Sequence, residues 1–318
     1  MEHILFTAEY KISGNTGGVG RVGATLAKGF IAKGHKVYFY AVDKREEDEM
    51  NGVPQYYCVN HLDITSRQNT DHLAALLKRL NITVIVNHSG FHHQIQQLLA
   101  TAKQPGVLLV TEHHNCIKCL YDNYRRIVTN TYGDKKWFPV LNNRLSWFLL
   151  KKSFKIRFKK TLRYVLQQSD KLVLLSNAFK NDLDFFSTNI NKEKVTAISN
   201  PASFDVQPGV LDKKENRLLF IGVLKTNQKR VERLIEIWEK ISKQYPHWHI
   251  DILGDGPERK FLEKSFKERG LERYQFYGFS DPRPFLEKAK IFLLTSDFEG
   301  FGMVLVESQA FGVVPMAF

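Results

Sequence analysis

The chain has 318 residues, of which 43% are apolar and 25% are charged, a composition typical of a globular protein with room for two domains. Its formal net charge of +13 predicts an anionic partner: nucleic acid, an acidic membrane surface or a phosphorylated substrate. No run approaches the roughly 18 to 20 apolar residues of a membrane-spanning helix, and no signal peptide precedes the first predicted strand, so we expect a cytoplasmic protein.

The first part of the chain has the pattern of a βαβ unit. Residues 4–8 are predicted to form a buried strand, and the glycine-rich residues 13–21 lead into a helix that runs to about Lys33. A second strand is predicted over 36–42. The amides at the start of such a helix favour an anion. Because Asp43 follows the second strand, a nicotinamide-dinucleotide site remains an alternative interpretation.

Further α/β units follow. Their alternation predicts a parallel sheet with helices on both faces. The predicted strands cover 56–59, 82–87 and 107–111, and the helices lie near 70–80 and 91–103.

Two adjacent histidines follow the last of these strands. Glu112, His113, His114 and Asn115 come directly after it, at the edge where open α/β sheets bind their ligands. A histidine at this edge is well placed to contact substrate hydroxyls. The alternative is a pair of surface histidines without a role in binding.

The three cysteines are too few for a disulfide framework. Cys116 and Cys119 form a C-x-x-C pair, which is compatible with zinc or redox chemistry, but only His113 and His114 are near it as further ligands. We therefore expect reduced thiols at these positions and at Cys58, and no metal site.

A basic stretch follows residues 121–138, which are rich in aromatic side chains, lack a regular period and are predicted to form a loop. Seven lysine or arginine residues fall between 151 and 163. One interpretation of 147–165 is a helix lying on an anionic membrane, where each basic residue contributes about 1 kcal/mol. The other is a helix that packs its apolar face on the domain. No nucleic-acid motif accompanies the charge, so no nucleic-acid partner is expected. The predicted apolar face consists of Trp147, Leu150, Phe154, Phe158, Leu162 and Val165.

The α/β pattern ends and then starts again. A linker is predicted near 201–215, where Pro208 and Gly209 are followed by a run of charges. Strands are predicted over 171–176, 195–201, 217–224, 248–253 and 273–278, a helix over 231–243, and a G-D-G-P turn over 254–257.

Two carboxylates flank a glycine turn close to Phe318. A strand over 289–295 leads into a loop with Glu299 and Gly302, and Glu307 lies in the first turns of the helix that follows. Glu299 has the chemistry to accept sugar hydroxyls, and Glu307 to accept the paired hydroxyls of a ribose. The alternative is an ordinary helix start, where the helix dipole favours acidic residues.

These motifs resemble those of one family. The run E-G-F-G-x-x-x-x-E, preceded by L-L-T-S-D-F and followed by A-F-G-V-V-P, resembles the motif of two glutamates separated by seven residues in the retaining glycosyltransferases of family four. The opening G-G-x-x-R-V, the I-x-N-P segment and the G-D-G-P turn are similar to the family as well. The resemblance covers nearly the whole chain, most specifically 217–315.

The resemblance implies an α/β protein with the GT-B fold, in which two Rossmann-like domains with parallel sheets face each other across a cleft. We expect an N-terminal, acceptor-side domain over 1–205 and a C-terminal, nucleotide-sugar donor domain over 206–318. Relatives continue for several more elements, so we expect the second domain of this sequence to be incomplete.

The resemblance also implies the catalytic and acceptor-side residues. Glu299 and His113 are the expected catalytic residues, with Glu299 contacting the transferred sugar. His114 is the alternative to His113 on the acceptor side, together with Arg21. Glu307 is expected to bind the ribose of the donor.

The donor diphosphate is expected beside Lys229. Family members have an arginine where this chain has Val223, and either Lys225 or Arg230 is expected to supply the missing charge. No cofactor and no metal are expected, since the nucleotide-sugar is a co-substrate. The other donor-binding residues implied by the resemblance are Gly17, Gly18, Gly222, Gly254, Gly256, Gly300, Phe301 and Gly302.

The expected function is transfer of a sugar, with retention at the anomeric carbon, from a nucleotide-diphosphate donor. The expected donor is a UDP-sugar. The expected acceptor is a hydroxyl of a glycan or a lipid-linked molecule in surface polysaccharide or glycolipid synthesis, at the inner face of the cell membrane. The alternatives are a non-catalytic GT-B module and a GT-B sugar-nucleotide epimerase. A dehydrogenase is disfavoured because the second domain repeats the Rossmann pattern and adds no hydride-transfer residues.

Overall fold

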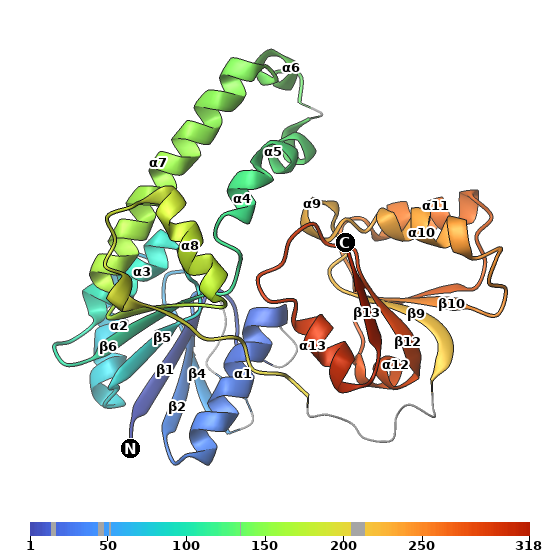
Figure 1. Ribbon diagram of the computed structural model, residues 1–318. Coiled ribbons are helices and arrows are strands. Elements are labelled where there is room, and N and C mark those ends of the chain that lie inside the picture. The colour runs from blue at the N-terminus through green and yellow to red at the C-terminus, as the bar shows by residue number, and fades with distance from the viewer. Residues whose placement is uncertain (14–16, 44–47, 51, 134, 205–213) are drawn as a thin grey trace. The chain divides into compact units, whose positions relative to one another are not determined.

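The computed structural model of the protein describes residues 1–13, 17–43, 48–50, 52–133, 135–204 and 214–318 (Figure 1). The chain forms two compact units. Unit 1 contains Met1–Arg125 and Asp134–Pro201, and unit 2 contains Arg126–Gly133 and Ala202–Phe318. The predicted linker falls largely on 205–213, outside the described residues.

Unit 1 contains an eight-stranded sheet in the order β3-β4-β2-β1-β5-β6-β7-β8 among the described residues. All neighbouring strands are parallel except β3 and β4, which form an antiparallel pair that the sequence analysis did not predict. In the centre, Ile4 of β1 lies opposite Val37 of β2 and Val84 of β5. The strands are β1 (His3–Ala8), β2 (Lys36–Ala41), β3 (Asp48–Met50), β4 (Val53–Tyr57), β5 (Val84–Asn87), β6 (Leu108–His113), β7 (Lys171–Leu174) and β8 (Val195–Ala197).

Helices cover both faces of this sheet, as predicted. Leu5 packs in a core with Tyr40, Ile85 and the leucines of α2 and α3. Its neighbours Ile4 and Phe6 pack in a second core with Ala27 and Phe30 of α1. Because successive side chains of a strand point to opposite faces, each face has its own apolar core. The helices are α1 (Gly17–Ala32), α2 (Arg67–Arg79), α3 (His93–Ala102) and α8 (Asn177–Phe186), with a 3-10 turn at Lys192–Lys194.

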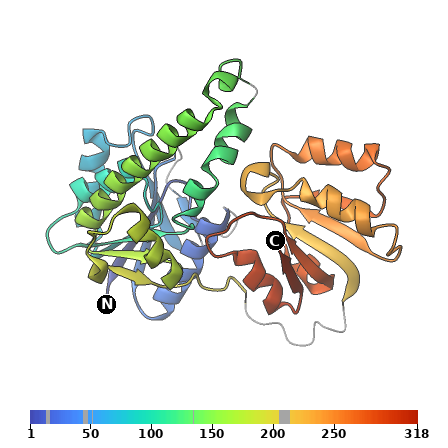
Figure 2. The same ribbon diagram turned by 45° about the horizontal axis from the view of Figure 1, so that its top comes forward.

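Four further helices lie between β6 and β7: α4 (Cys119–Asp122), α5 (Tyr124–Tyr132), α6 (Phe138–Leu141) and α7 (Arg144–Gln168). The predicted loop over 121–138 is therefore wrong, because α4 and α5 occupy most of it. At 25 residues, α7 spans roughly 37 Å. Its C-terminal part packs on unit 1 through Leu162, Val165 and Leu166, whereas its N-terminal part extends away from the sheet in Figures 1 and 2.

Unit 2 contains a five-stranded, wholly parallel sheet in the order β11-β10-β9-β12-β13 among its described residues. Leu218 and Phe220 of β9 pack against Trp238 of α10 and Leu262 of α11, while Leu219 packs on the opposite face with α12 and α13. The strands are β9 (Glu215–Ile221), β10 (His249–Leu253), β11 (Tyr274–Gly278), β12 (Ala289–Leu294) and β13 (Val314–Ala317). The helices are α9 (Thr226–Lys229), α10 (Arg233–Ile241), α11 (Arg259–Glu268), α12 (Arg283–Lys288) and α13 (Met303–Ala310).

Each unit is therefore Rossmann-like, with a mainly parallel sheet between two layers of helices. The fold class inferred from the resemblance is confirmed for these two units. Among the described helices, none combines the length and the apolar character needed to cross a bilayer.

Candidate active site

The predicted catalytic glutamate lies on the loop between β12 and α13 in unit 2. Glu299 is thus at the carboxyl edge of the parallel sheet, where ligands of such sheets bind. Gly302 caps α13 with a φ of 69°, in the left-handed region that favours glycine. Gly300 and Phe301, which lie between Glu299 and Gly302 in the sequence, are half-buried.

Lys229 and Glu299, which are 70 residues apart in the sequence, meet in an ion pair. Lys229 Nζ donates to Glu299 Oε1 over 2.6 Å, and both side chains are about one-fifth exposed. A Cβ added to Gly222 would come within 3.8 Å of Lys229 Cε, so Gly222 lies beside the same ammonium group. The structure brings these three predicted residues together at one edge of the sheet.

Backbone contacts hold this pair in place. Asp297 donates its amide to the carbonyl of Gln228, and the Gln228 side chain donates back to the carbonyl of Phe298. The Thr295 hydroxyl donates to the carbonyl of Lys229. The loop that carries Glu299 is therefore fixed to α9, and the ion pair is pre-positioned.

The two other predicted cations differ in their surroundings. The Arg230 guanidinium donates to Asp297 over 3.0 Å and also contacts Glu232, so acidic groups of the protein hold it in place. Arg233 binds the same Asp297 carboxylate over 2.8 Å. Lys225 is exposed on the preceding loop. The assignment of either Lys225 or Arg230 to the donor diphosphate remains a prediction.

Three glycines predicted to bind the donor, Gly222, Gly254 and Gly256, lie where the loop after β9 and the loop after β10 approach each other closely. Gly254 has a φ of 121°, and a Cβ there would lie 1.9 Å from the carbonyl oxygen of Gly222. A Cβ on Gly256 would lie 2.4 Å from the carbonyl oxygen of Leu224. The loops are joined by hydrogen bonds from Gly222 N to Leu253 O and from Leu224 N to Asp255 O. Packing thus accounts for these glycines with or without a ligand.

We expect Gly254→Ala to lower the free energy of unfolding by about 2–5 kcal/mol, because it adds both a backbone strain and a clash. Gly270→Ala is the matched control. Gly270 also has a positive φ, of 61°, but a Cβ there would meet no atom of the described residues within 4 Å. Gly270→Ala is therefore expected to lower the free energy of unfolding by only about 1–2 kcal/mol. Urea denaturation of both variants measures the difference, and equal losses would contradict the close approach.

Glu307 lies in the second turn of α13 and is completely buried. A carboxylate in this position is desolvated and lies near a helix N-terminus, which favours negative charge. The expected ribose contact remains a prediction.

Gly17 and Gly18 begin α1 in unit 1. Gly17 has a φ of 71°, and a Cβ on either glycine would meet no atom of the described residues within 4 Å. Arg21, one turn further along, is half-buried. The predicted loop also includes residues 14–16, which lie outside the described residues.

His114 belongs to a cluster that the sequence analysis did not predict. His88 Nδ1 lies 2.8 Å from His114 Nε2 and 3.0 Å from Glu112 Oε2, and His114 Nε2 lies 3.4 Å from the same oxygen. The signal for His88 was its position directly after β5, since β5 and β6 are neighbours in the sheet. Burial and the nearby charge of His88 lower the pKa of His114 to about 4, so its ring is neutral at pH 7.

Glu112 is ionised in this cluster. Burial raises the pKa of its carboxyl, but the hydrogen bond from His88 and the electrostatic interactions with His88 and His114 outweigh burial and lower it.

His113 points into a different environment. Its ring lies 4.5 Å from the ring of Phe91, and a Cβ added to Gly90 would come within 2.6 Å of its Nδ1. Burial and the nearby His114 lower the pKa of His113 to about 3. This ring is neutral and packed, and its expected catalytic role remains a prediction.

The cysteines differ from expectation. Cys116 and Cys119 are joined in a disulfide, with their Cα atoms 5.5 Å apart, so the expectation of reduced thiols is wrong for this pair. The turn from Cys116 to the start of α4 brings the two side chains to the same side. Cys58 is a free, buried thiol that donates to the carbonyl of Val42, and burial raises its pKa to about 11.

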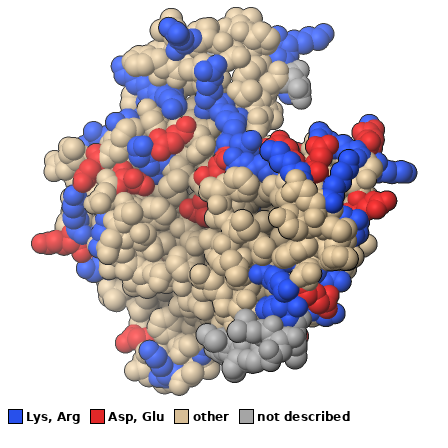
Figure 3. All heavy atoms as spheres, turned by 45° about the vertical axis from the view of Figure 1, so that its right-hand side comes forward, with Lys and Arg blue, Asp and Glu red and all other residues tan. Residues whose placement is uncertain are grey.

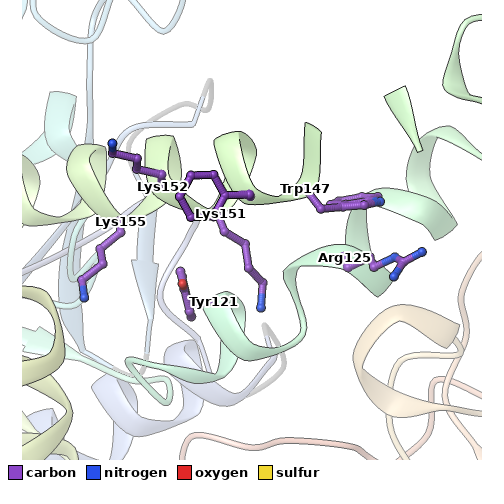
Figure 4. Close-up of a pocket in the computed structure, with 7 residues that line it drawn as sticks. Tyr121, Arg125, Trp147, Lys151, Lys152 and Lys155 are labelled. Atoms are coloured by element: carbon purple, nitrogen blue, oxygen red, sulfur yellow. The ribbon is translucent and has the colours of Figure 1, made fainter. Parts of the chain in front are cut away.

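A groove of about 450 Å³ lies between α7 on one side and α4 and the first turn of α5 on the other (Figure 4). Lys151 Nζ lies 4.7 Å from the centre of the Tyr121 ring, and the Arg125 guanidinium lies 5.5 Å from that of Trp147. These are cation–π contacts. The groove is lined by Tyr121, Arg125, Trp147, Phe148, Lys151, Lys152 and Lys155.

The apolar face predicted for α7 packs inward, and a second apolar stripe is exposed. Trp147, Leu162 and Val165 are buried, and Phe154 and Phe158 pack against the same core. The exposed stripe consists of Leu145, Phe148, Leu149 and Ile156, with Trp137 and Val140 exposed on the neighbouring segment. In Figure 3, lysine and arginine side chains stand among uncharged atoms at the top of the view, over α6 and α7.

Two Rossmann-like units are the architecture of the GT-B class of glycosyltransferases. Residues 16–205 match the family model described as Glycosyltransferase Family 4, and residues 203–318 match that described as Glycosyl transferases group 1. The chain therefore belongs to Glycosyltransferase Family 4 and is a glycosyltransferase of the hexosyltransferase type.

Individual relatives agree with this assignment. An uncharacterized glycosyltransferase of Haemophilus influenzae is 23% identical over 96% of this chain and 78% of its own length. A lipopolysaccharide 1,6-galactosyltransferase of Salmonella typhimurium is 28% identical over 62% of this chain, an alignment that spans 52% of that enzyme. The fold is also that of a mutant of S. aureus TarM in complex with fondaparinux, alpha-GlcNAc-glycerol and UDP, with a TM-score of 0.72, 12% identity, and coverage of 100% of this chain and 86% of TarM.

Proposed function

We propose that this chain transfers a sugar from a UDP-linked donor to a hydroxyl of a glycan or lipid-linked acceptor, in the synthesis of surface polysaccharide or glycolipid. The names of its relatives support this proposal, because one is a lipopolysaccharide galactosyltransferase and the solved TarM complex contains UDP. The observation that carries it is the Lys229–Glu299 pair, held beside Gly222 at the carboxyl edge of a parallel sheet.

The chemistry of the pair suits a departing diphosphate. Positive charge that is already in place stabilises negative charge as it develops on the leaving group. Lys229 supplies that charge, and Glu299 both holds the ammonium in place and offers oxygens to sugar hydroxyls. In this proposal the leaving group needs no bound metal, and the sugar is transferred with retention at its anomeric carbon.

A donor and acceptor screen tests the reaction. Purified protein is incubated with UDP-, GDP- and ADP-linked sugars, with and without lipid-linked and glycan acceptors, and nucleotide release is followed. We expect UDP release that depends on an acceptor, and NMR of the product gives the anomeric configuration. A changed sugar nucleotide formed without acceptor would identify an epimerase. Donor binding without turnover on any acceptor would identify a non-catalytic module.

We further propose that the chain docks on an anionic membrane through the N-terminal half of α7. The exposed stripe of Leu145, Phe148, Leu149 and Ile156 offers apolar area for the acyl boundary. Lysines flank this stripe, and Lys152 is exposed. Apolar burial and attraction to anionic lipids both contribute to such binding. The surface covers 137–156 and overlaps only the N-terminal part of the stretch 147–165 that the sequence analysis identified.

Phe148→Ser is expected to weaken binding to phosphatidylglycerol vesicles by about 10- to 100-fold, since burying an exposed aromatic side chain contributes roughly 1.5–3 kcal/mol. Lys152→Gln is expected to weaken it by about fivefold, with no effect on phosphatidylcholine vesicles. Co-sedimentation measures both. Leu62→Ser and Lys240→Gln are matched controls at exposed positions elsewhere. Equal binding by parent and α7 variants would refute docking through this helix.

A further inference from the structure

We propose that His88, Glu112 and His114 form a binding site for a divalent transition-metal ion such as Zn²⁺. The three donor atoms, His88 Nδ1, Glu112 Oε2 and His114 Nε2, lie 2.8 to 3.4 Å from one another. All three residues belong to unit 1, at the carboxyl ends of the neighbouring strands β5 and β6.

The spacing of the donor atoms fits a tetrahedral site. Zinc lies about 2.0–2.1 Å from imidazole nitrogen and 2.0–2.2 Å from carboxylate oxygen, which places neighbouring donors roughly 3.3–3.5 Å apart. The distances in the cluster are equal to this or shorter by about half an ångström. Small rotations of the side chains are therefore enough to seat an ion against all three atoms.

With His114 protonated on Nδ1, the cluster has more acceptors than protons. His114 Nδ1 lies 3.3 Å from Asn200 Oδ1, and a proton on Nδ1 leaves Nε2 with a lone pair that points towards Glu112. His88 Nδ1 then carries one proton for two acceptors. The lone pair of His114 Nε2 then lies 3.4 Å from a carboxylate oxygen that also presents lone pairs, and such a contact is repulsive. A cation between them removes this repulsion.

Asn200 is placed to orient the His114 ring without binding the ion itself. Histidines that bind metals commonly donate their second ring nitrogen to an oxygen, which fixes the tautomer that can coordinate. The contact between His114 and Asn200 has this geometry. The His88 ring is likewise fixed, stacked 5.2 Å from the ring of Phe6 at an interplanar angle of 8°.

The chemistry of the donors selects the ion. Two imidazoles and one carboxylate suit zinc and its neighbours in the first transition row, whereas Mg²⁺ and Ca²⁺ prefer oxygen ligands alone. The His88 side chain is fully buried, while 16% of the Glu112 side chain and 7% of the His114 side chain are exposed. An ion can therefore enter from the side of Glu112, and three protein ligands leave a fourth position for water or substrate.

Calorimetric titration of the chelator-treated protein with Zn²⁺ tests the site. We expect one saturable site per chain and no binding of Mg²⁺. Glu112→Gln and His114→Gln each remove one ligand and are expected to lower the affinity more than 100-fold. Asn200→Ala removes only the outer support and is expected to lower it about 10- to 100-fold.

Two controls exclude other sources of binding. The double variant Cys116→Ser/Cys119→Ser removes the sulfur atoms near the cluster, and His61→Gln removes an exposed histidine; both are expected to bind Zn²⁺ like the parent. Circular dichroism establishes that each variant is folded. X-ray absorption of the zinc-loaded parent is independent of any variant and is expected to show imidazole nitrogen ligands. The absence of saturable binding, unchanged affinity in Glu112→Gln and His114→Gln, or sulfur ligands would overturn the proposal.

Discussion

Replacing Glu307 with alanine is expected to weaken binding of a UDP-sugar about 30-fold or more, because loss of one partner of a buried, charged hydrogen bond costs roughly 2–5 kcal/mol. Glu307 is completely buried in α13, so water does not replace its carboxylate easily. In the proposed site its oxygens accept the two ribose hydroxyls. Alanine leaves both hydroxyls without an acceptor when the donor binds.

Calorimetric titration with UDP and UDP-sugars measures this effect. Glu307→Gln keeps one acceptor oxygen and the side-chain volume, so its loss is expected to be smaller. Glu236→Ala is the matched control, since Glu236 is an exposed glutamate on α10, and its donor affinity is expected to equal that of the parent. A thermal melt establishes that each variant is folded. Unchanged affinity in folded Glu307→Ala would remove the ribose contact from the proposal.

The sequence predicts most strands of the two sheets because they have a strong local signal, whereas β3 and β13 were not predicted. The apolar runs at 4–8 and 217–224 are bounded by turn residues, and such runs form strands buried on both faces. The helices over 121–138 are different. Their aromatic residues contact α7 and its neighbours, as Tyr121 does with Phe154 and Phe185. Their apolar pattern therefore depends on contacts between elements, which a local period does not reveal.

The sequence left two interpretations of α7 open, and the structure bears out the one in which its predicted apolar face packs on the domain. The helix has apolar residues on two sides, and periodicity identifies each stripe equally well. Only the packing against Phe186 and Leu183 determines that the side with Leu162 faces inward. The side with Phe148 then remains exposed, which is the observation that favours membrane docking.

In the candidate site, too, the sequence identified individual residues, whereas the contacts between them are known only from the structure. Lys229 and Glu299 were identified separately, each from its own motif, and the structure joins them. Asp297 lies in the quoted S-D-F-E run, yet its role in holding Arg230 and Arg233 depends on the adjacency of β12 and β9. His88 was missed because its partners come from a neighbouring strand. Contacts of this kind are set by topology.

Lys229→Met is expected to lower kcat by about 100- to 1000-fold, the usual effect of removing one group that stabilises developing negative charge. The change in KM is expected to be smaller, because the charge on the leaving diphosphate increases in the transition state. Steady-state kinetics with saturating acceptor measure both constants. Lys240→Met is the matched control, since Lys240 is exposed in the last turn of α10, and its kinetics are expected to equal those of the parent.

The double variant Lys229→Met/Glu299→Gln separates two roles of the pair. If Glu299 acts only by holding Lys229, its loss has little further effect once Lys229 is gone, and the effects of the single variants do not add. If Glu299 also binds the transferred sugar, the double variant loses more activity than Lys229→Met alone. The geometry favours the second result, because the hydrogen bond from Lys229 goes to Oε1 of Glu299, and the second carboxylate oxygen can accept from a sugar hydroxyl. Equal kcat/KM for Lys229→Met and the double variant would limit Glu299 to positioning Lys229.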